Sequence, residues 1–441
     1  MEMNEIRLEA QDLNQQGAIL LKSGNLEAAK TKFDKAIEID PMLMDSYKNY
    51  GDLYMALQEY QNAKNSYKKA MLIEKNGLLH FLYGNACFMN DELHEGFESY
   101  NLAINEGYDS DEMMFFMGMA YEHMNDDNMA LRYFQKACIK NPSRPDYLIK
   151  KIKTLIRLGM LDNANESTEE LLAKAPEMFD GYHIKTMLLL HKKDYESAIV
   201  FAKAASEKFP EDADLLYDYA KSLSLAKKLD DAIKVIEHAK ALKYFVDAER
   251  SFTLLEGQIF AECNNFEKAV TCCEKCIELE DEVTFDGEAR FMLMNLYLAE
   301  PNYEKALEQS MEIVKRNVED LYYYAALYYK PFCTKQLGDT DAARALFKEA
   351  NSIYRLATLK NPAAIDVYLY RALCMKELEE YDKALDLLDF IDGLSTEIAE
   401  VHVIRSDIYS IQGRKSLADE ELQKAYRIKP ELKVNSESAG V

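Results

Sequence analysis

The chain alternates between apolar helical faces and short polar breaks. In one stretch, aromatic residues stand at i, i+3 and i+7: Tyr47, Tyr50 and Tyr54. After the polar break ALQEYQN, small and aromatic residues stand at i, i+4 and i+7: Ala63, Tyr67 and Ala70. Both spacings place their residues on one side of an α-helix. The pattern therefore predicts two antiparallel helices joined by a short turn.

The same two-helix unit recurs about every 34 residues, because residues 47–75 follow residues 13–41 at that offset. A small residue in the second helix marks each unit: Ala29, Ala63, Gly96, Ala130, Ala164, Ala198, Ala232, Ala269, Ala306, Ala343, Ala384 and Ala418. The steps are 33 or 34 residues in most units and lengthen to 37 or 41 between Ala232 and Ala384. Twelve units therefore span about residues 10–430 and leave no room for a separate globular domain.

This pattern closely resembles the tetratricopeptide repeat. The family pattern has a large residue at position 4, Leu-Gly at 7–8, Tyr at 11, Ala at 20, Phe at 24, Ala at 27 and Pro at 32. The fourth unit carries it at Met114, Gly118, Tyr121, Ala130, Phe134, Ala137 and Pro142. The resemblance implies an all-α, right-handed superhelical solenoid of about 12 helix-turn-helix repeats. It also implies that the first helix of each repeat lines the concave side.

The repeats set the expected boundaries of the chain. Regular repeats 1–9 should occupy residues 1–314, an irregular tenth repeat 315–365, repeats 11–12 residues 366–430, and a frayed tail 431–441. In the tenth repeat, Pro331 falls within the predicted first helix and should kink it, because proline removes a backbone hydrogen bond. Its second helix should run past the usual end. We expect the superhelix to change curvature there, as a passive bend or as a functional hinge.

Charge and hydropathy exclude several classes of partner. The net charge of −24 disfavours binding to nucleic acid and to anionic lipid. The mean hydropathy is −0.34, and no stretch approaches the roughly 18 apolar residues of a membrane helix, so no membrane insertion is expected. The first residues lack the basic and apolar regions of a secretory signal. Together with eight irregularly spaced cysteines, this predicts a reducing, cytoplasmic location.

Three cysteines within six residues raise the question of a metal site: Cys272, Cys273 and Cys276. In the repeat register, Cys273 and Cys276 fall at positions 24 and 27, which are packing positions. Cysteine behaves there as a small hydrophobic residue. A zinc site needs four ligands, and the nearest histidine, His238, lies outside this repeat. We expect a packing role and predict no metal and no other cofactor.

No motif indicates catalysis. The seven histidines are scattered, and the sequence contains neither HExxH nor a glycine-rich phosphate loop. We therefore predict that the chain is not an enzyme. Two alternatives remain open: a peptide-sensing regulatory protein, and an enzyme with a cryptic site in the groove. Regulators of the first kind usually carry a DNA-binding helix-turn-helix, for which the chain offers no non-repeat segment.

The resemblance also indicates which residues face a partner. Positions 2, 5, 6, 9, 12 and 13 of the first helix are expected to face the concave groove. In repeats three, four and ten they include Leu78, Phe81, Leu82, Asn85, Glu112, Phe115, Phe116, Met119, Tyr328 and Tyr329. Some of these side chains could instead pack between helices. We expect a protein- or peptide-binding scaffold or adaptor whose groove takes a segment with hydrophobic anchors and a basic flank.

Overall fold

The computed structural model describes residues 2–242, 248–280, 285, 287–394 and 397–432. These residues form 24 α-helices and contain no strand, which confirms an all-α solenoid of helix pairs. The expected frayed tail lies outside the described residues from position 433 onward. None of the described helices combines the length and hydropathy needed to cross a bilayer.

The helices are named in chain order. The first twelve are α1 (Glu2–Lys22), α2 (Leu26–Ile39), α3 (Met44–Ala56), α4 (Tyr60–Ile73), α5 (Gly77–Met89), α6 (Leu93–Asn105), α7 (Asp111–His123), α8 (Asp127–Lys140), α9 (Pro145–Arg157), α10 (Leu161–Lys174), α11 (Phe179–His191) and α12 (Tyr195–Lys208). The others are α13 (Ala213–Leu225), α14 (Leu229–Ala239), α15 (Glu249–Glu262), α16 (Phe266–Glu278), α17 (Gly287–Ala299), α18 (Tyr303–Arg316), α19 (Leu321–Gln336), α20 (Thr340–Lys360), α21 (Ile365–Glu377), α22 (Tyr381–Leu394), α23 (Ala399–Ile411) and α24 (Lys415–Ile428).

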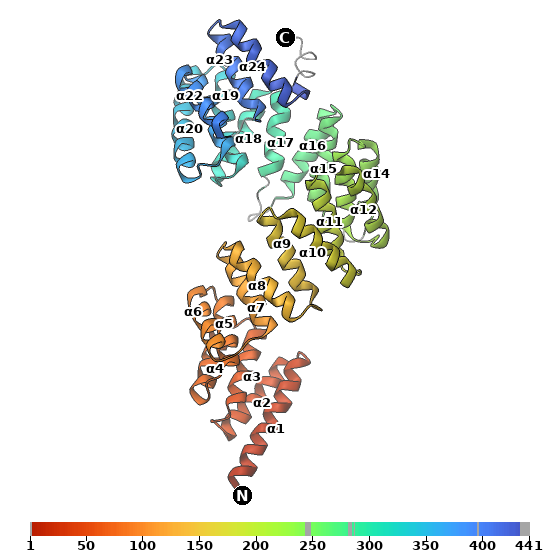
Figure 1. Cartoon of the computed structure of the whole chain (residues 1–441), viewed down its shortest axis with the longest axis vertical. Coiled ribbons are helices and arrows are strands. Elements are labelled where there is room, and N and C mark those ends of the chain that lie inside the picture. The colour runs from red at the N-terminus through yellow and green to blue at the C-terminus, as the bar shows by residue number, and fades with distance from the viewer. Residues whose placement is uncertain (1, 243–247, 281–284, 286, 395–396, 433–441) are drawn as a thin grey trace. The chain divides into compact units, whose positions relative to one another are not determined.

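The chain forms two compact units, residues 1–218 and 219–441, and the boundary falls inside α13. The odd-numbered helices are the first helices of the repeats, and they pack against the even-numbered helices that follow them, as α1 does against α2 and α23 against α24. Figure 1 shows these helix pairs in chain order. The odd-numbered helices also contact one another, as α19 does with α17 and with α21. We call the side of the odd-numbered helices that carries positions 2, 5, 6, 9, 12 and 13 the inner face.

Local turn chemistry explains why each repeat reverses where it does. Most turns between first and second helices hold a residue with positive φ, as at Gly24, Asn125 and Gly338. In several repeats an N-cap side chain then accepts a hydrogen bond from the backbone of the next helix: Asn25, Asp126, Asp194, Asn265, Asn302 and Asp339. Such a cap satisfies a backbone donor that the first turn of a helix leaves without a partner.

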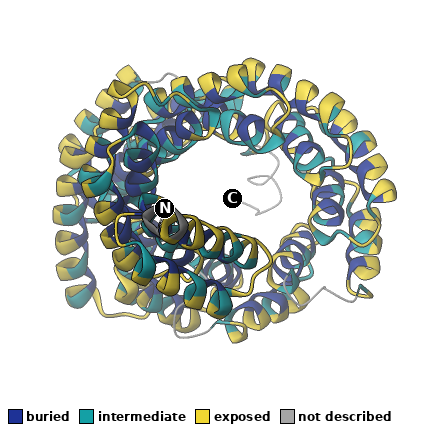
Figure 2. Cartoon of the chain, turned by 90° about the horizontal axis from the view of Figure 1, so that it is seen from below, coloured by how far each residue is buried: buried dark blue, intermediate teal, exposed yellow. Residues whose placement is uncertain are grey.

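Close contact between a glycine and an aromatic ring holds the first four repeats together. A Cβ atom added to Gly17 would lie 2.5 Å from the ring of Phe33, and one added to Gly118 would lie 2.6 Å from Phe134. Gly51 and Gly84 meet Tyr67 and Tyr100 in the same way. The ring thus occupies the space that any side chain would need. In Figure 2 the buried residues lie on the sides of helices that face other helices.

The irregular tenth repeat consists of α19 and α20. Pro331 is buried inside α19, which continues past it as one helix. The second helix, α20, is 21 residues long, against 14 in α18 and α22. Its extra turns are anchored by Tyr354, which is fully buried and donates a hydrogen bond of 2.6 Å to the backbone carbonyl of Tyr324.

Two of the longer steps, from Ala232 to Ala269 and from Ala269 to Ala306, have a different origin. Their length alone is compatible with longer helices or with longer turns. The connection between α14 and α15 covers residues 240–248, and that between α16 and α17 covers residues 279–286, whereas α2 and α3 are joined by residues 40–43. In these two steps the additional residues therefore lie between repeats, in connections that include positions outside the described residues. In the step from Ala306 to Ala343 they lengthen the first helix instead, because α19 has 16 residues against 13 in α17.

Candidate protein-binding surface

Three of the predicted partner-facing residues are buried in the structure. Phe81 is 3% exposed and its ring stacks on Tyr108, with centroids 5.2 Å apart. Asn85 is 9% exposed and accepts a hydrogen bond of 2.7 Å from the hydroxyl of Tyr100. Tyr328 is 6% exposed. These side chains contribute to the fold and, in this conformation, offer a partner little surface.

The remaining predicted residues of repeats three and four lie on α5 and α7 and keep part of their surface open. Leu78, Leu82, Phe115, Phe116 and Met119 are half-buried. The ring of Phe115 stacks on the ring of Tyr147 from α9, with centroids 4.7 Å apart. Glu112 is exposed. The structure thus brings these residues together as a partly open apolar strip beside an acidic group.

Tyr329, the last of the predicted residues, lines a concave pocket of about 770 Å³ among α19, α21 and α23. We call it the α21 pocket. Its apolar lining consists of Tyr329, Ile365, Leu369, Tyr370, Leu373, Ile398, Val403, Ile404 and Leu432. Its polar lining consists of Asp366, Glu397, Glu400 and Asp407. An apolar floor with acidic groups is suited to a chain segment that carries both apolar and basic residues.

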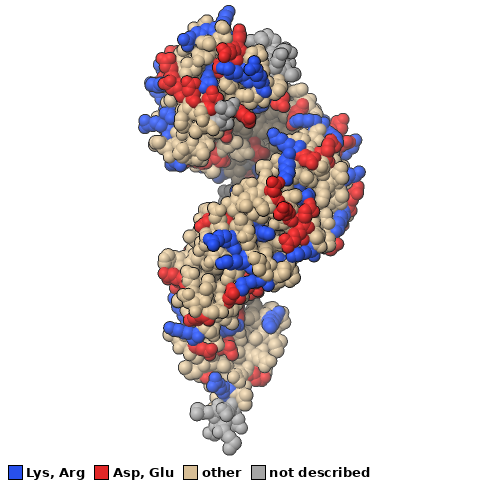
Figure 3. All heavy atoms as spheres, viewed as in Figure 1, with Lys and Arg blue, Asp and Glu red and all other residues tan. Residues whose placement is uncertain are grey.

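The carboxylates of the α21 pocket differ in their partners. Asp407 forms an ion pair with Lys376 at 2.9 Å, and Glu400 forms one with Lys429 at 3.3 Å. Asp366 and Glu397 make no ion pair with any residue in the described part of the chain. All four are exposed. On the face shown in Figure 3, acidic and basic residues are otherwise interspersed over both units.

Two tyrosines give the α21 pocket hydrogen-bonding capacity. The hydroxyl groups of Tyr329 and Tyr370 make no hydrogen bond within the residues that the structure describes. Burial raises the pKa of both phenols. Both therefore remain protonated at neutral pH and can donate a hydrogen bond, for example to a backbone carbonyl of a bound segment.

A second concave pocket, of about 480 Å³, lies among α15, α17 and α19. We call it the α17 pocket. Its lining consists of Gln258, Ala261, Glu262, Glu288, Phe291, Met292, Asn295, Leu296, Ala299 and Tyr322. It resembles the α21 pocket in combining an apolar surface with carboxylates. Both pockets belong to the unit formed by residues 219–441.

Most residues of both pockets are absent from the predicted set, although the repeat register points to them. The same register that selected residues in repeats three, four and ten can be applied to repeats eight, nine, eleven and twelve. In repeat eleven, positions 2, 5, 6 and 9 are Asp366, Leu369, Tyr370 and Leu373, and all four line the α21 pocket. In repeat nine, positions 2, 5, 6 and 9 are Glu288, Phe291, Met292 and Asn295, and all four line the α17 pocket.

The clustered cysteines pack into the core. Cys273 and Cys276 are fully buried in α16, which agrees with the expected packing role. Cys272 is also buried. A Cβ atom added to Gly257 would lie 3.0 Å from the Cβ atom of Cys272, so the two helices are in close contact there. Burial raises the pKa of the Cys272 thiol to about 11. A protonated thiol is a poor nucleophile and a poor metal ligand at neutral pH.

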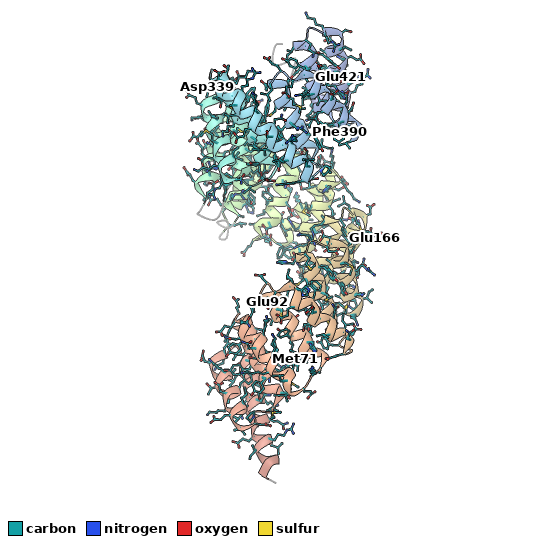
Figure 4. The ribbon with its side chains drawn as sticks, turned by 90° about the vertical axis from the view of Figure 1, so that its left-hand side faces the viewer. Met71, Glu92, Glu166, Asp339, Phe390 and Glu421 are labelled. Atoms are coloured by element: carbon teal, nitrogen blue, oxygen red, sulfur yellow. The ribbon has the colours of Figure 1, made fainter. Side chains whose placement is uncertain are left out.

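One other group brings a cysteine and carboxylates together. Ligand atoms of Cys87, Glu92 and Glu95 lie within 4.8 Å of one another. Glu92, labelled in Figure 4, stands at the start of α6. The ammonium group of Lys64, which is 3% exposed, contacts Glu92 and lies 3.0 Å from Glu95. The lysine therefore already supplies the positive charge that a metal ion would bring to these carboxylates.

Comparison with known families decides the assignment. The tetratricopeptide repeat matches residues 13–41, 45–76, 111–138, 254–282 and 399–432, and a second form of the same repeat matches residues 189–245. The chain is a tetratricopeptide repeat protein. The matched segments coincide with helix pairs such as α1–α2, α3–α4 and α15–α16. This confirms the family that the sequence pattern suggested.

Individual relatives are distant. The chain is 27% identical over 152 residues to anaphase-promoting complex subunit 3 of Schizosaccharomyces pombe, which involves 33% of the chain and 22% of that protein. It is 24% identical over 339 residues to tetratricopeptide repeat protein 37 of Xenopus laevis, which involves 66% of the chain and 21% of that protein. The chain thus spans about a fifth of the length of these relatives.

The similarity to solved structures is also at low sequence identity. Yeast Tom70 is 13% identical, with a TM-score of 0.49, and the match covers 97% of this chain and 99% of that one. Helical repeat solenoids provide extended surfaces for binding other proteins. The family assignment therefore supports a protein-interaction scaffold.

Proposed function

We propose that this tetratricopeptide repeat protein is a non-catalytic scaffold or adaptor that binds a protein segment in the α21 pocket. The observation that carries this proposal is the pocket itself: about 770 Å³, with a floor of apolar residues from three successive first helices and four carboxylates. The segment would place an apolar anchor against Leu369, Leu373 and Val403. Lysine or arginine residues beside the anchor would approach Asp366 and Glu397.

The energetics favour such an anchor. Full burial of one leucine or phenylalanine side chain contributes about 1.5–3 kcal/mol. Anchors of this kind often dominate binding, and their truncation costs on the order of 2 kcal/mol. The exposed carboxylates contribute more to the association rate and to selectivity than to affinity. The expected partner is therefore an apolar segment with a basic flank.

The strip on α5 and α7 is proposed as a second contact surface. It comprises Leu78, Leu82, Phe115, Phe116 and Met119, which keep part of their surface open beside the exposed Glu112. One distant relative is by name a subunit of a complex. By analogy, we propose that the chain works within an assembly of several proteins, in which two surfaces would serve two contacts.

The test introduces a lysine into the α21 pocket and compares captured proteins by quantitative mass spectrometry. Val403 is half-buried and lines the pocket, so Val403→Lys should repel a basic segment while leaving the core intact. Leu356→Lys is the matched control, because Leu356 is 56% exposed on α20. We expect Val403→Lys to lose at least tenfold of the specifically captured protein and the control to retain it.

Two further measurements keep this test decisive. Melting temperatures of both variants should match that of the unchanged protein, which separates loss of binding from loss of structure. Met119→Lys introduces the same positive charge into the strip on α5 and α7. If Met119→Lys abolishes capture and Val403→Lys leaves it intact, the α21 pocket is not the main site, and the strip takes its place.

A further inference from the structure

The α17 pocket and the α21 pocket lie on either side of α19 and share its inner face. Tyr322 lines the α17 pocket and Tyr329 lines the α21 pocket. These residues are seven positions apart, which is close to two full helical turns, so they lie on the same side of α19. Most of the other lining residues also occupy inner-face positions of their helices, among them Gln258, Asn295, Asp366 and Val403. Both pockets are therefore accessible to one bound chain.

We infer that a single partner segment binds both pockets at once, with one apolar anchor in each and basic residues beside and between the anchors. This inference rests on the proposed function, because it extends the segment bound in the α21 pocket across α19. The segment is inferred to be extended. A helical segment would need many more residues between its two anchors to span the same distance.

Charge favours a basic segment along the whole path. The two pockets are lined by six carboxylates: Glu262, Glu288, Asp366, Glu397, Glu400 and Asp407. Neither lining includes a lysine or an arginine among the described residues. Lysines outside the lining pair with three of them, as Lys227 does with Glu262 at 2.9 Å. The other three make no ion pair in the described part of the chain, and a basic partner residue could neutralise each.

The helix spacing predicts the distance between the anchors. The α17 pocket centres on α17 and the α21 pocket on α21, two inner helices further along. Adjacent packed helices are about 10 Å apart, so the pockets are about 20 Å apart. An extended chain advances about 3.3 Å per residue, which puts the anchors about six to seven residues apart. An α-helix, at about 1.5 Å per residue, would need about 13 residues for the same distance.

The experiment selects peptides from a random phage-displayed library, each about 16 residues long so that the insert exceeds the predicted span. The target is the full-length protein. We expect enriched peptides to carry two apolar residues about six to seven positions apart, together with lysine or arginine. An enriched peptide is then synthesised with both anchors, and again with either anchor changed to serine. Its affinity is measured for four proteins: the unchanged chain, Val403→Lys, Asn295→Lys and the control Leu356→Lys.

The expected result is reciprocal. Val403→Lys in the α21 pocket and Asn295→Lys in the α17 pocket should each weaken the two-anchor peptide at least tenfold, since linked anchors gain by effective concentration. Each one-anchor peptide should respond to one of the two variants only. Leu356→Lys should change neither.

Other results distinguish the inference from the proposed function. Enriched peptides with a single anchor, or insensitivity to Asn295→Lys with sensitivity to Val403→Lys, would overturn two-point binding and leave the proposed function standing. Insensitivity to both variants, or the absence of any enriched peptide, would overturn both. Enriched anchors about 13 residues apart would mean that the segment binds as a helix, against the extended form inferred.

Discussion

At the scale of single residues, the fold depends on pairs that the sequence spacing reveals. Gly118 and Phe134 are 16 positions apart and meet across the two helices of one repeat, with no room for a Cβ atom between them. The family pattern states this pair as position 8 and position 24. The residues are therefore recognisable from sequence, and the structure adds the physical reason for the glycine.

Gly118→Ala should destabilise the protein, because the added Cβ would lie 2.6 Å from the Phe134 ring and force it to move. Overpacking of this kind typically costs about 1–3 kcal/mol. Gly393→Ala is the matched control, since Gly393 lies in α22 with no atom within 4 Å of the added Cβ. There the better helix propensity of alanine should stabilise by up to about 1 kcal/mol. Urea unfolding midpoints would check both, and equal midpoints would contradict the proposed contact.

Thiol reactivity offers a second prediction at this scale. Cys263 is exposed, whereas the other seven cysteines are buried or half-buried. Burial raises the pKa of Cys87, Cys138 and Cys333 to about 11, as it does for Cys272. Ellman's reagent at pH 8 should therefore react rapidly with one thiol of the native chain. The remaining thiols should react only on unfolding.

The control for this reactivity is Cys263→Ser, which should remove the rapid phase and leave the slow phases unchanged. A rapid phase that persists in this variant would show that one of the buried thiols reaches solvent. In particular, rapid loss of a thiol from the α16 cluster would contradict the packing role of Cys272, Cys273 and Cys276.

At the scale of helices, the sequence predicted their number and pairing but not every length. The polar breaks and the 34-residue spacing were sufficient for 24 helices. They could not distinguish a lengthened helix from a lengthened connection, because both add residues to the same step. In the tenth repeat the excess extends α20 to Lys360, and between α14 and α15 it lies in the connection. In α20, the burial of Tyr354 stabilises the extra turns. This is a tertiary contact, which the residue spacing does not reveal.

Ion pairs between helices of different repeats give a prediction for pH. A hydrogen bond from the Tyr83 hydroxyl, and then contact with Lys64 at 3.0 Å, lower the pKa of Glu95 from its ordinary value of 4.5 to about 2. A lowered pKa in the folded state means that the contribution of Glu95 to stability is fully present above pH 4.5. It is lost as the pH falls from there towards 2.

Glu95→Gln should therefore lower the urea midpoint at pH 7, and the difference from the unchanged protein should shrink between pH 5 and pH 3. Glu166→Gln serves as the control, because Glu166 is exposed on α10 (Figure 4). Its midpoint should follow that of the unchanged protein at each pH. A Glu95→Gln difference that stays constant with pH would mean that the glutamate acts through packing and not through its charge.

At the scale of the whole molecule, surface residues were harder to predict than the fold. The register assigns positions 2, 5, 6, 9, 12 and 13 to the inner face, yet Phe81 and Tyr328 are buried at such positions while Tyr329 lines a pocket. Whether an inner-face side chain is covered depends on the size of its neighbours on the adjacent first helices. Those neighbours belong to other repeats, so a rule applied to one repeat at a time cannot decide the exposure.

The net charge of −24 leads to the last prediction, which separates the roles of charge and apolar contact in binding a basic peptide selected as above. Exposed carboxylates attract such a peptide over distance, so its association rate should fall at least tenfold between about 50 and 500 mM salt, as screening shortens from about 14 to 4 Å. The buried anchor should govern dissociation, so Val403→Ala should raise the dissociation rate and leave the salt dependence unchanged. Asp366→Asn with Glu397→Gln should do the reverse, lowering the association rate at low salt only. Stopped-flow fluorescence would measure both rates, and a salt-independent association rate would show that the carboxylates of the α21 pocket do not attract the partner.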